Sequence, residues 1–388
     1  MASIIVNVEQ SILKWVLAQT KEERLGEKLL VSVKDWLDGK KKPTFRQVEE
    51  LSRKSNIPLG YFFLQQPPSE HIPLLEYRTV DSVKISNPSR DLIDTIKDMG
   101  AVQGWMADYR KERGFEQVKV AGSLKGKNKP ESIARKMRED LGIKASWYQD
   151  LNDSRQSFRF FRNKLEENAV LVMMNGVVRQ NTHRPLNSNE FRAFAMSDKW
   201  APLIFINAND SHGARLFSLL HEAVHIWMGE NDLYNDRHET VSHDKGLEAL
   251  CNAAAAEILV PIEDLKKMWE ETSNVYDDEE QIVSQLAKIF CCGETVIARR
   301  ALEQKFISKS VYQTISARAI QNYQKLAEKK SGGSYYNTKL SRLDRMFVHA
   351  IAESVMTGRV TYTEAYRLTA TNDKTFPEML RRMEGVGV

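Results

Sequence analysis

Two histidines four positions apart, with a glutamate directly after the first, lie in the segment FSLLHEAVHIW at residues 217–227. On an α-helix, residues i and i+4 share a face, so His221 and His225 can direct their imidazoles at one metal ion. Glu222 projects from the adjacent flank, where its carboxylate can hold and deprotonate a water at the metal. Gly229 is placed to end this helix one turn later. The segment therefore predicts a metal site with a general base. The alternative is an ordinary helix with two buried histidines.

A catalytic zinc ion needs a third protein ligand and leaves its fourth position for water. The segment GLEALCNAAAAEILVP at 246–261 supplies Glu248, and its run of alanines would let this second helix approach the first closely. Asn252 lies one turn beyond Glu248, where it could hydrogen-bond the outer ring nitrogen of a ligand histidine. Glu257 is the rival ligand, but it falls on a nearly opposite helix face. We therefore expect Zn²⁺ to be held by the two histidines and Glu248.

Four further side chains are candidates for contact with a substrate. His238 and His243 lie between the two helices, and they are either solvated loop residues or stabilisers of an oxyanion. The segment EFRAFAMS at 190–197 predicts a strand that contains Arg192 and Phe194. We expect it to be an edge strand that pairs with an extended substrate. Arg192 then either guides an acidic substrate or is a solvated strand charge.

The composition is that of an ordinary globular chain, with 388 residues of which 42% are apolar and 28% are charged. This length favours two or three compact units. No run of about 18 uncharged apolar residues is present and no secretory leader is visible at the start, so we expect a cytoplasmic protein without a membrane partner. Cys251, Cys291 and Cys292 are too few for a disulfide framework and are expected in the core. The net charge of +4 does not indicate a nucleic-acid partner by itself.

The sequence pattern divides the chain into four stretches. Short helices precede a proline-rich linker, a charged helical connector follows, and three β-prone runs then precede the HExxH segment. The remainder is mostly helical. The predicted fold class is α+β, mainly α, with one small sheet. The stretches are residues 1–70, 71–165, 166–300 and 301–388.

The first 70 residues contain basic side chains that could contact phosphates or a partner protein, namely Lys34, Lys40, Lys41 and Lys42. The segment SVKDWLDG predicts a helix that begins at Ser32 and stops at Gly39. This helix contains two aspartates and lacks an Arg or Gln that could read base edges. We therefore favour recognition of a protein over sequence-specific binding of DNA, and expect any DNA contact to be weak or indirect.

The paired segments LFSLLHEAVHIWMG and EALCNAAAAEILVP resemble the motifs of the ImmA/IrrE family of metallopeptidases, in which an HExxH helix precedes E-x-x-x-N-x-x-A-A. Three other segments look like the longer members of that family, which have an N-terminal helix-turn-helix-like domain of the XRE type: WLDGKKKPTFRQVEELSRKSNIPLGYFFL, RPLNSNEFRAFAMSDKWAPLIFINANDS and GGSYYNTKLSRLDRMF. The resemblance thus implies a helix-turn-helix-like domain at 1–70 and a zincin-like metallopeptidase domain at 166–300.

The resemblance also implies a gluzincin-type zinc peptidase, with His221, His225 and Glu248 as ligands and Glu222 as general base. Its implied substrate is a small helix-turn-helix repressor or antitoxin from a mobile-element or toxin–antitoxin locus. The alternative is a DNA-binding transcriptional regulator with a structural or inactive zinc site. Glu222 favours the enzyme, because a structural zinc site normally closes with four protein ligands and gains nothing from a base.

Overall fold

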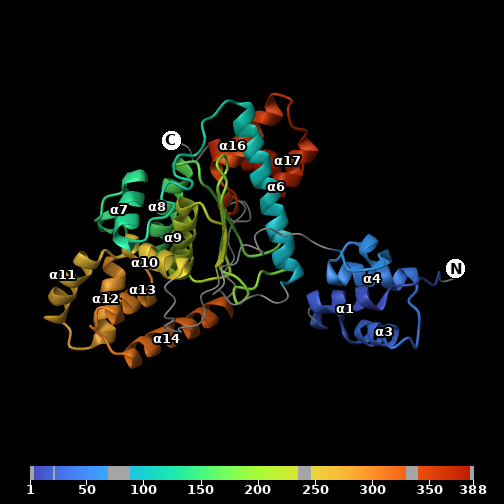
Figure 1. Cartoon of the computed structure of the whole chain (residues 1–388), viewed down its shortest axis with the longest axis horizontal. Coiled ribbons are helices and arrows are strands. Elements are labelled where there is room, and N and C mark those ends of the chain that lie inside the picture. Colours follow the sequence, from blue (N-terminus) through green and yellow to red (C-terminus); the bar gives the residue numbers. More distant parts are fainter. Residues whose placement is uncertain (1–3, 21, 69–87, 235–245, 329–339, 385–388) are drawn as a thin grey trace. The chain divides into compact units, whose positions relative to one another are not determined.

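The computed structural model describes residues 4–20, 22–68, 88–234, 246–328 and 340–384 (Figure 1). The chain divides into two compact units. One consists of Met1–Glu76 with Ser82–Lys97, and the other of Tyr77–Asp81 with Asp98–Val388. Helices predominate and are accompanied by one small sheet, as the α+β prediction requires. No helix of the described ranges combines the length and the apolar character needed to cross a membrane.

The first unit has a helical core. Its described elements are α1 (Gln10–Gln19), α2 (Glu22–Leu25), α3 (Glu27–Leu37), α4 (Phe45–Ser55) and the short 3₁₀ helix η1 (Leu59–Phe63). The helix predicted to begin at Ser32 in fact begins five residues earlier, at Glu27. Ser32 lies inside α3 and donates its hydroxyl to the Lys28 carbonyl, so it does not cap the helix. Leu29, which precedes Ser32, belongs to the same buried face of α3 as Val33, so the helix includes the residues before Ser32.

The second unit contains a four-stranded sheet with the order β1-β3-β2-β4. β1 and β3 are parallel, whereas β2 is antiparallel to both β3 and β4. The register pairs Ala195 of β2 with Asp232 of β4. The strands are β1 (Leu171–Asn175), β2 (Ala193–Met196), β3 (Leu203–Asn207) and β4 (Asp232–Tyr234).

The strand that we expected at the edge of the sheet is an inner strand. β2 is paired on both sides, so the prediction that it offers an exposed edge to a substrate is wrong for this structure. Phe194 is fully buried and stacks on Phe205, with 5.0 Å between the ring centroids. Arg192, directly before β2, lies 3.5 Å from the Asp210 carboxylate and is paired within the protein. The edge is occupied because β4 pairs with β2.

The HExxH segment lies in α9 (His212–Met228). Three other helices share its apolar core, namely α7 (Pro130–Asp140), α8 (Ser154–Glu167) and α10 (Leu247–Leu259). α9 packs on β2 and β3, while α8 and α10 pack on α9 (Figure 1). α7 packs on α10 and contributes to the same apolar core as α9. The helices expected as a connector thus share their core with the HExxH helix. The three cysteines are buried and unbridged, as predicted.

The HExxH helix is fixed at its C-terminus by close backbone contacts. Gly229 ends α9 in the left-handed conformation, as predicted. The backbone N–H groups of Gly122 and Leu124 donate to the carbonyls of Ile226 and Trp227 in the last turn of the helix. A Cβ at Gly229 would lie 3.0 Å from the Gly122 backbone, so this approach depends on glycine.

The remaining described helices complete the second unit. They are α6 (Arg90–Glu112), the 3₁₀ helix η2 (Trp147–Asp150), α11 (Ile262–Ser273), α12 (Glu279–Ile289), α13 (Glu294–Glu303), α14 (Lys309–Glu328), α16 (Arg345–Met356), α17 (Tyr362–Thr369) and α18 (Thr375–Glu384). Of these, α11, α12 and α13 contribute to the core around α9. The first residues of α6, up to Lys97, belong to the first unit.

The start of α9 is positioned by a second close approach, and this generates a stability prediction. A Cβ at Gly213 would lie 2.8 Å from the Gly293 Cα, a contact that backbone movement alone can relieve. We expect Gly213→Ala to destabilise the chain by about 1–3 kcal/mol, the usual cost of overpacking. Gly104→Ala, inside α6 with no atom within 4 Å of the new Cβ, should instead stabilise by about 0.5–1 kcal/mol. The urea unfolding midpoints of the two variants are compared. Equal midpoints would contradict the close contact between Gly213 and Gly293.

Candidate metal centre

His221 and His225 meet on one face of α9. Their Nε2 atoms lie 3.2 Å apart, and the two side chains are 0% and 1% exposed. Ser211 begins the helix by accepting the N–H of Ala214, and apolar neighbours bury the rest of this face. The spacing of four residues therefore brings the two imidazoles together as predicted.

Glu248 lies in the first turn of α10 and reaches both imidazoles. Its two carboxylate oxygens lie 3.3 Å from the Nε2 atoms of His221 and His225. The helices approach closely where Ala254 and Ala255 of α10 are fully buried. The sequence preference for Glu248 over its rival thus agrees with the geometry.

Glu257, the rival candidate, lies on another face of α10. Its carboxylate forms a buried ion pair with Arg300 and accepts the N–H of Ile262 at 3.3 Å. A carboxylate that is already paired inside the protein needs no metal ion to offset its burial. Glu257 therefore holds α10 against α13 and does not belong to the candidate metal centre.

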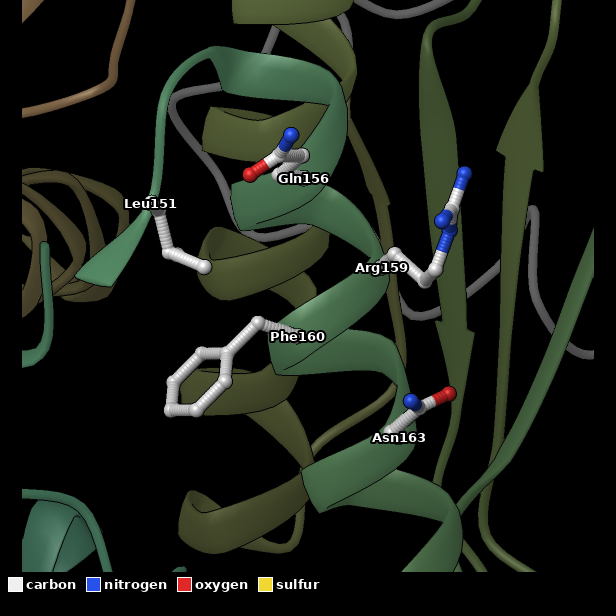
Figure 2. Close-up of a pocket in the computed structure, with 5 residues that line it drawn as sticks. All are labelled: Leu151, Gln156, Arg159, Phe160 and Asn163. Carbon is white, nitrogen blue, oxygen red and sulfur yellow. The ribbon is translucent and has the colours of Figure 1, made fainter. Parts of the chain in front are cut away.

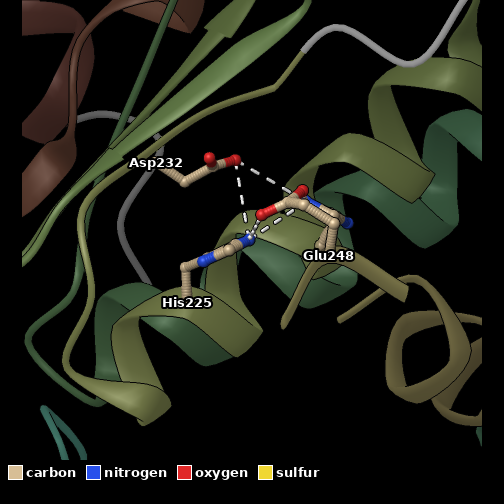
Figure 3. Close-up of side chains that lie close together, drawn as sticks. His225, Asp232 and Glu248 are labelled. Carbon is tan, nitrogen blue, oxygen red and sulfur yellow. Dashed lines mark hydrogen bonds and ion pairs between the residues drawn. The ribbon is translucent and has the colours of Figure 1, made fainter. Parts of the chain in front are cut away.

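Asp232 is a fourth member of the cluster, and the sequence analysis missed it. Its Oδ2 atom lies 3.5 Å from Nε2 of His225 and 3.7 Å from Nε2 of His221. Figure 3 shows this carboxylate pointing from β4 toward the same point as His225 and Glu248. One ligand atom from each of the four residues lies within 4.8 Å of the others. A strand of three residues has too little alternation to be seen in the sequence, so the only available signal was an acidic residue soon after the helix end.

The distances fit a tetrahedral ion. Zinc bonds of about 2.0–2.1 Å place neighbouring ligand atoms about 3.3 Å apart, the edge of a tetrahedron of that size. The two imidazole nitrogens lie 3.2 Å apart, and each lies 3.3 Å from a different carboxylate oxygen of Glu248, Oε2 for His221 and Oε1 for His225. Two imidazoles and a carboxylate are also ordinary zinc ligands. These side chains therefore have the types and the approximate spacing of zinc ligands.

The electrostatics of the cluster also favour a cation. Burial and the nearby Asp232 carboxylate raise the pKa of Glu222 well above its usual value. Burial lowers the pKa of His225. Burial also acts to lower the pKa of His221, but hydrogen bonds to Asp232 and Glu248 outweigh it and raise that pKa to about 10. Three carboxylates lie close to the two imidazoles here, and a cation among them would offset their charge.

Glu222 has the position expected of a general base. It is fully buried beside His221, and neither carboxylate oxygen accepts a hydrogen bond from a described residue. Buried carboxylates normally have partners, so a pair of unsatisfied oxygens indicates a group that meets a water or a substrate. Glu222 is not one of the four residues whose ligand atoms gather at the candidate metal centre.

We expected Asn252 to hydrogen-bond a ligand histidine, but the structure does not show this hydrogen bond. Its Oδ1 atom is buried and accepts no hydrogen bond from the described residues, and Nδ1 of His225 likewise has no partner among them. Asn252 lies one turn after Glu248 on α10, but the hydrogen bond that would give it a role behind the metal is missing. His238 and His243, the two candidate stabilisers of an oxyanion, lie outside the described residues.

A separate shallow hollow of about 250 Å³ lies along α8 (Figure 2). It is lined by Leu151 and by four residues of α8, namely Gln156, Arg159, Phe160 and Asn163. These five side chains include no carboxylate, imidazole or thiol, so this hollow has no metal-binding group. Among the described residues, the group of possible metal ligands lies between α9, α10 and β4.

The cluster lies in a segment that is similar to a known protein family. Residues 343–382 match a family model described as a domain of unknown function (DUF8813). No curated protein matches the chain. Residues 166–302, which contain Glu222 and all four clustered side chains, match the Peptidase_M78 family model, described as an IrrE N-terminal-like domain. This match supports the resemblance to the ImmA/IrrE family and a metallopeptidase-like function for the segment.

Proposed function

We propose that the chain is a zinc-dependent endopeptidase of gluzincin type. The observation that carries this proposal is the meeting of His221, His225 and Glu248 at 3.2–3.3 Å, with the unpartnered carboxylate of Glu222 beside them. Three ligands with an adjacent base are the groups that peptide hydrolysis needs. The match of residues 166–302 to a peptidase family supports the same reaction.

The roles of the side chains follow from their positions. Zinc held by His221, His225 and Glu248 would lower the pKa of a water molecule and polarise the scissile carbonyl. Glu222 accepts the proton of the attacking water, because its oxygens are directed to no other described group. When the C–N bond breaks, Glu222 returns this proton to the leaving amine. The burial of His221, Glu222 and His225 limits the access of competing water to the reaction.

A protein substrate of the helix-turn-helix class, either a repressor or an antitoxin, is the proposal for what is cleaved. The resemblance to long ImmA/IrrE members supports it, and the first unit would recognise the partner. Lys40 and Lys41 lie 2.7 Å and 2.8 Å from the carboxylates of Asp38 and Asp35. These ion pairs offset two charges of the basic cluster, which weakens the case for binding the phosphates of DNA.

The metal prediction concerns zinc content. Protein purified without added metal should contain one zinc per chain, and His221→Ala and Glu248→Ala should each remove most of it, because each change removes one of the three groups that meet at 3.2–3.3 Å. Glu263→Ala, which removes an exposed carboxylate of α11, should retain the zinc. Elemental analysis measures all three. Full zinc in both His221→Ala and Glu248→Ala would refute the ligand assignment.

The base prediction concerns Glu222→Gln. The amide keeps the shape of the side chain but cannot take a proton, so proteolysis should fall by about a hundredfold or more while zinc is retained. The thermal midpoint should not fall, because the change removes a buried acidic group that has no described partner. Cleavage is measured by co-expression with the protein encoded by the neighbouring gene. Undiminished cleavage by the variant would exclude Glu222 as the base.

The partner prediction concerns the first unit. With two of its lysines paired to aspartates, the chain should bind its own promoter no better than scrambled DNA near physiological salt. A gel-shift comparison tests this. A strong promoter preference, lost when Lys40, Lys41 and Lys42 are all replaced with alanine, would instead favour the DNA-binding regulator.

A further inference from the structure

The candidate metal centre has four protein groups where a working peptidase needs three. Asp232 occupies the side of the cluster that His221, His225 and Glu248 leave open, with Oδ2 at 3.5 Å and 3.7 Å from the two imidazoles (Figure 3). A zinc site with four protein ligands has no position for water and is typical of structural sites. Glu222 is nevertheless buried beside it, and a structural site does not use such a base.

Asp232 reaches the cluster from a strand that lies where an extended substrate would lie. β4 pairs antiparallel with β2, and β2 packs directly on α9, the helix of the HExxH motif. Peptides commonly bind proteins by adding a strand to the free edge of a sheet. Without β4, the edge of β2 beside the cluster would be free. β4 therefore places a segment of the chain itself along this edge and a carboxylate oxygen among the ligands.

We propose that β4 is an internal blocking strand, which keeps the proposed peptidase latent by ligating the metal through Asp232. A protein substrate or partner that pairs with β2 displaces β4, removes this carboxylate and opens the fourth position. The proposal rests on the proposed function for its enzymatic consequence. The ligation by Asp232 itself can be measured without any cleavage.

The geometry makes Asp232 the ligand that can leave. Its two distances to the imidazoles, 3.5 Å and 3.7 Å, exceed the 3.3 Å of Glu248. The histidines and Glu248 belong to helices that pack on each other through a shared core. Within the part of the chain that the structure describes, β4 has three residues and its one strand partner is β2. Few backbone hydrogen bonds therefore have to be broken to release it.

Cobalt in place of zinc provides the test, because its visible absorption reports the number and type of ligands. The full chain, loaded with one Co²⁺, is titrated with acetohydroxamate, a small anion that needs an open metal position. The wild-type spectrum should hardly change. Asp232→Ala and the closer mimic Asp232→Asn should show altered bands and bind acetohydroxamate about tenfold tighter or more, because the blocked state no longer competes.

Glu230→Gln is the matched control. It removes a carboxylate two positions from Asp232, close enough to act electrostatically on His225, but outside the four clustered groups. Its cobalt spectrum and its affinity for acetohydroxamate should equal those of the wild type. A response equal to that of Asp232→Ala would show that lost charge, and not a lost ligand, explains the effect, and would overturn the proposal.

Two other results would overturn the blocking role. One is wild-type protein that binds acetohydroxamate as tightly as the Asp232 variants. The other is a failure of both Asp232 variants to hold cobalt, which would make Asp232 an obligatory ligand. Cleavage of the protein encoded by the neighbouring gene is scored separately and should rise in Asp232→Ala. If the spectra change as expected and no variant cleaves, ligation by Asp232 is supported while the peptidase proposal fails.

Discussion

The burial of charge is the constraint on which the second unit depends. Asp232 and Glu248 lie in one cluster with two imidazoles, and Glu222 is buried next to His221. Such a group of carboxylates is stable only when positive charge lies among them. A divalent cation supplies it without protonating the ligands. Because α9, α10 and β4 all carry candidate ligands, a bound cation would join three separate elements, and its binding would then be coupled to the folding of this region.

The helices around the cluster are held so that these ligands arrive together. Beyond the backbone contacts at the end of α9, the indole N–H of Trp227 donates to Asp140 of α7 at 2.9 Å. The guanidinium of Arg138, also on α7, donates to the Glu257 carbonyl on α10 at 3.0 Å. α7 thus contacts both helices that carry ligands, and it comes from the stretch that we had taken as a connector. Ligand geometry in this fold depends on residues far outside the HExxH motif.

The sequence predicted those parts of the fold and site that depend on short-range spacing. The i, i+4 pair on α9, the end of that helix at Gly229 and the face of α10 that carries Glu248 all follow from helix periodicity. Asp232 did not, because its position is set by the pairing of β4 with β2, a contact between segments almost forty residues apart. The same pairing turned the expected edge strand into an inner one.

Errors in local detail had a different cause. Ser32 is a good helix cap by residue type, yet α3 begins five residues before it because Leu29 and Val33 belong to the same buried face. Asn252 was given a partner from its helical position alone, whereas the hydrogen bond requires an exact distance between two side chains. Burial and periodicity can be estimated from a sequence, but the partner of a single polar atom depends on the whole packed structure.

The register of β4 has one further consequence. Alternate residues of a strand face opposite sides of a sheet, so a slip of β4 along β2 by a single residue would turn Asp232 away from the imidazoles. Such a slip exchanges one set of backbone hydrogen bonds for another. The open and closed forms of the metal position therefore need not differ much in backbone pairing, and the choice between them would depend on which neighbour contacts this short strand.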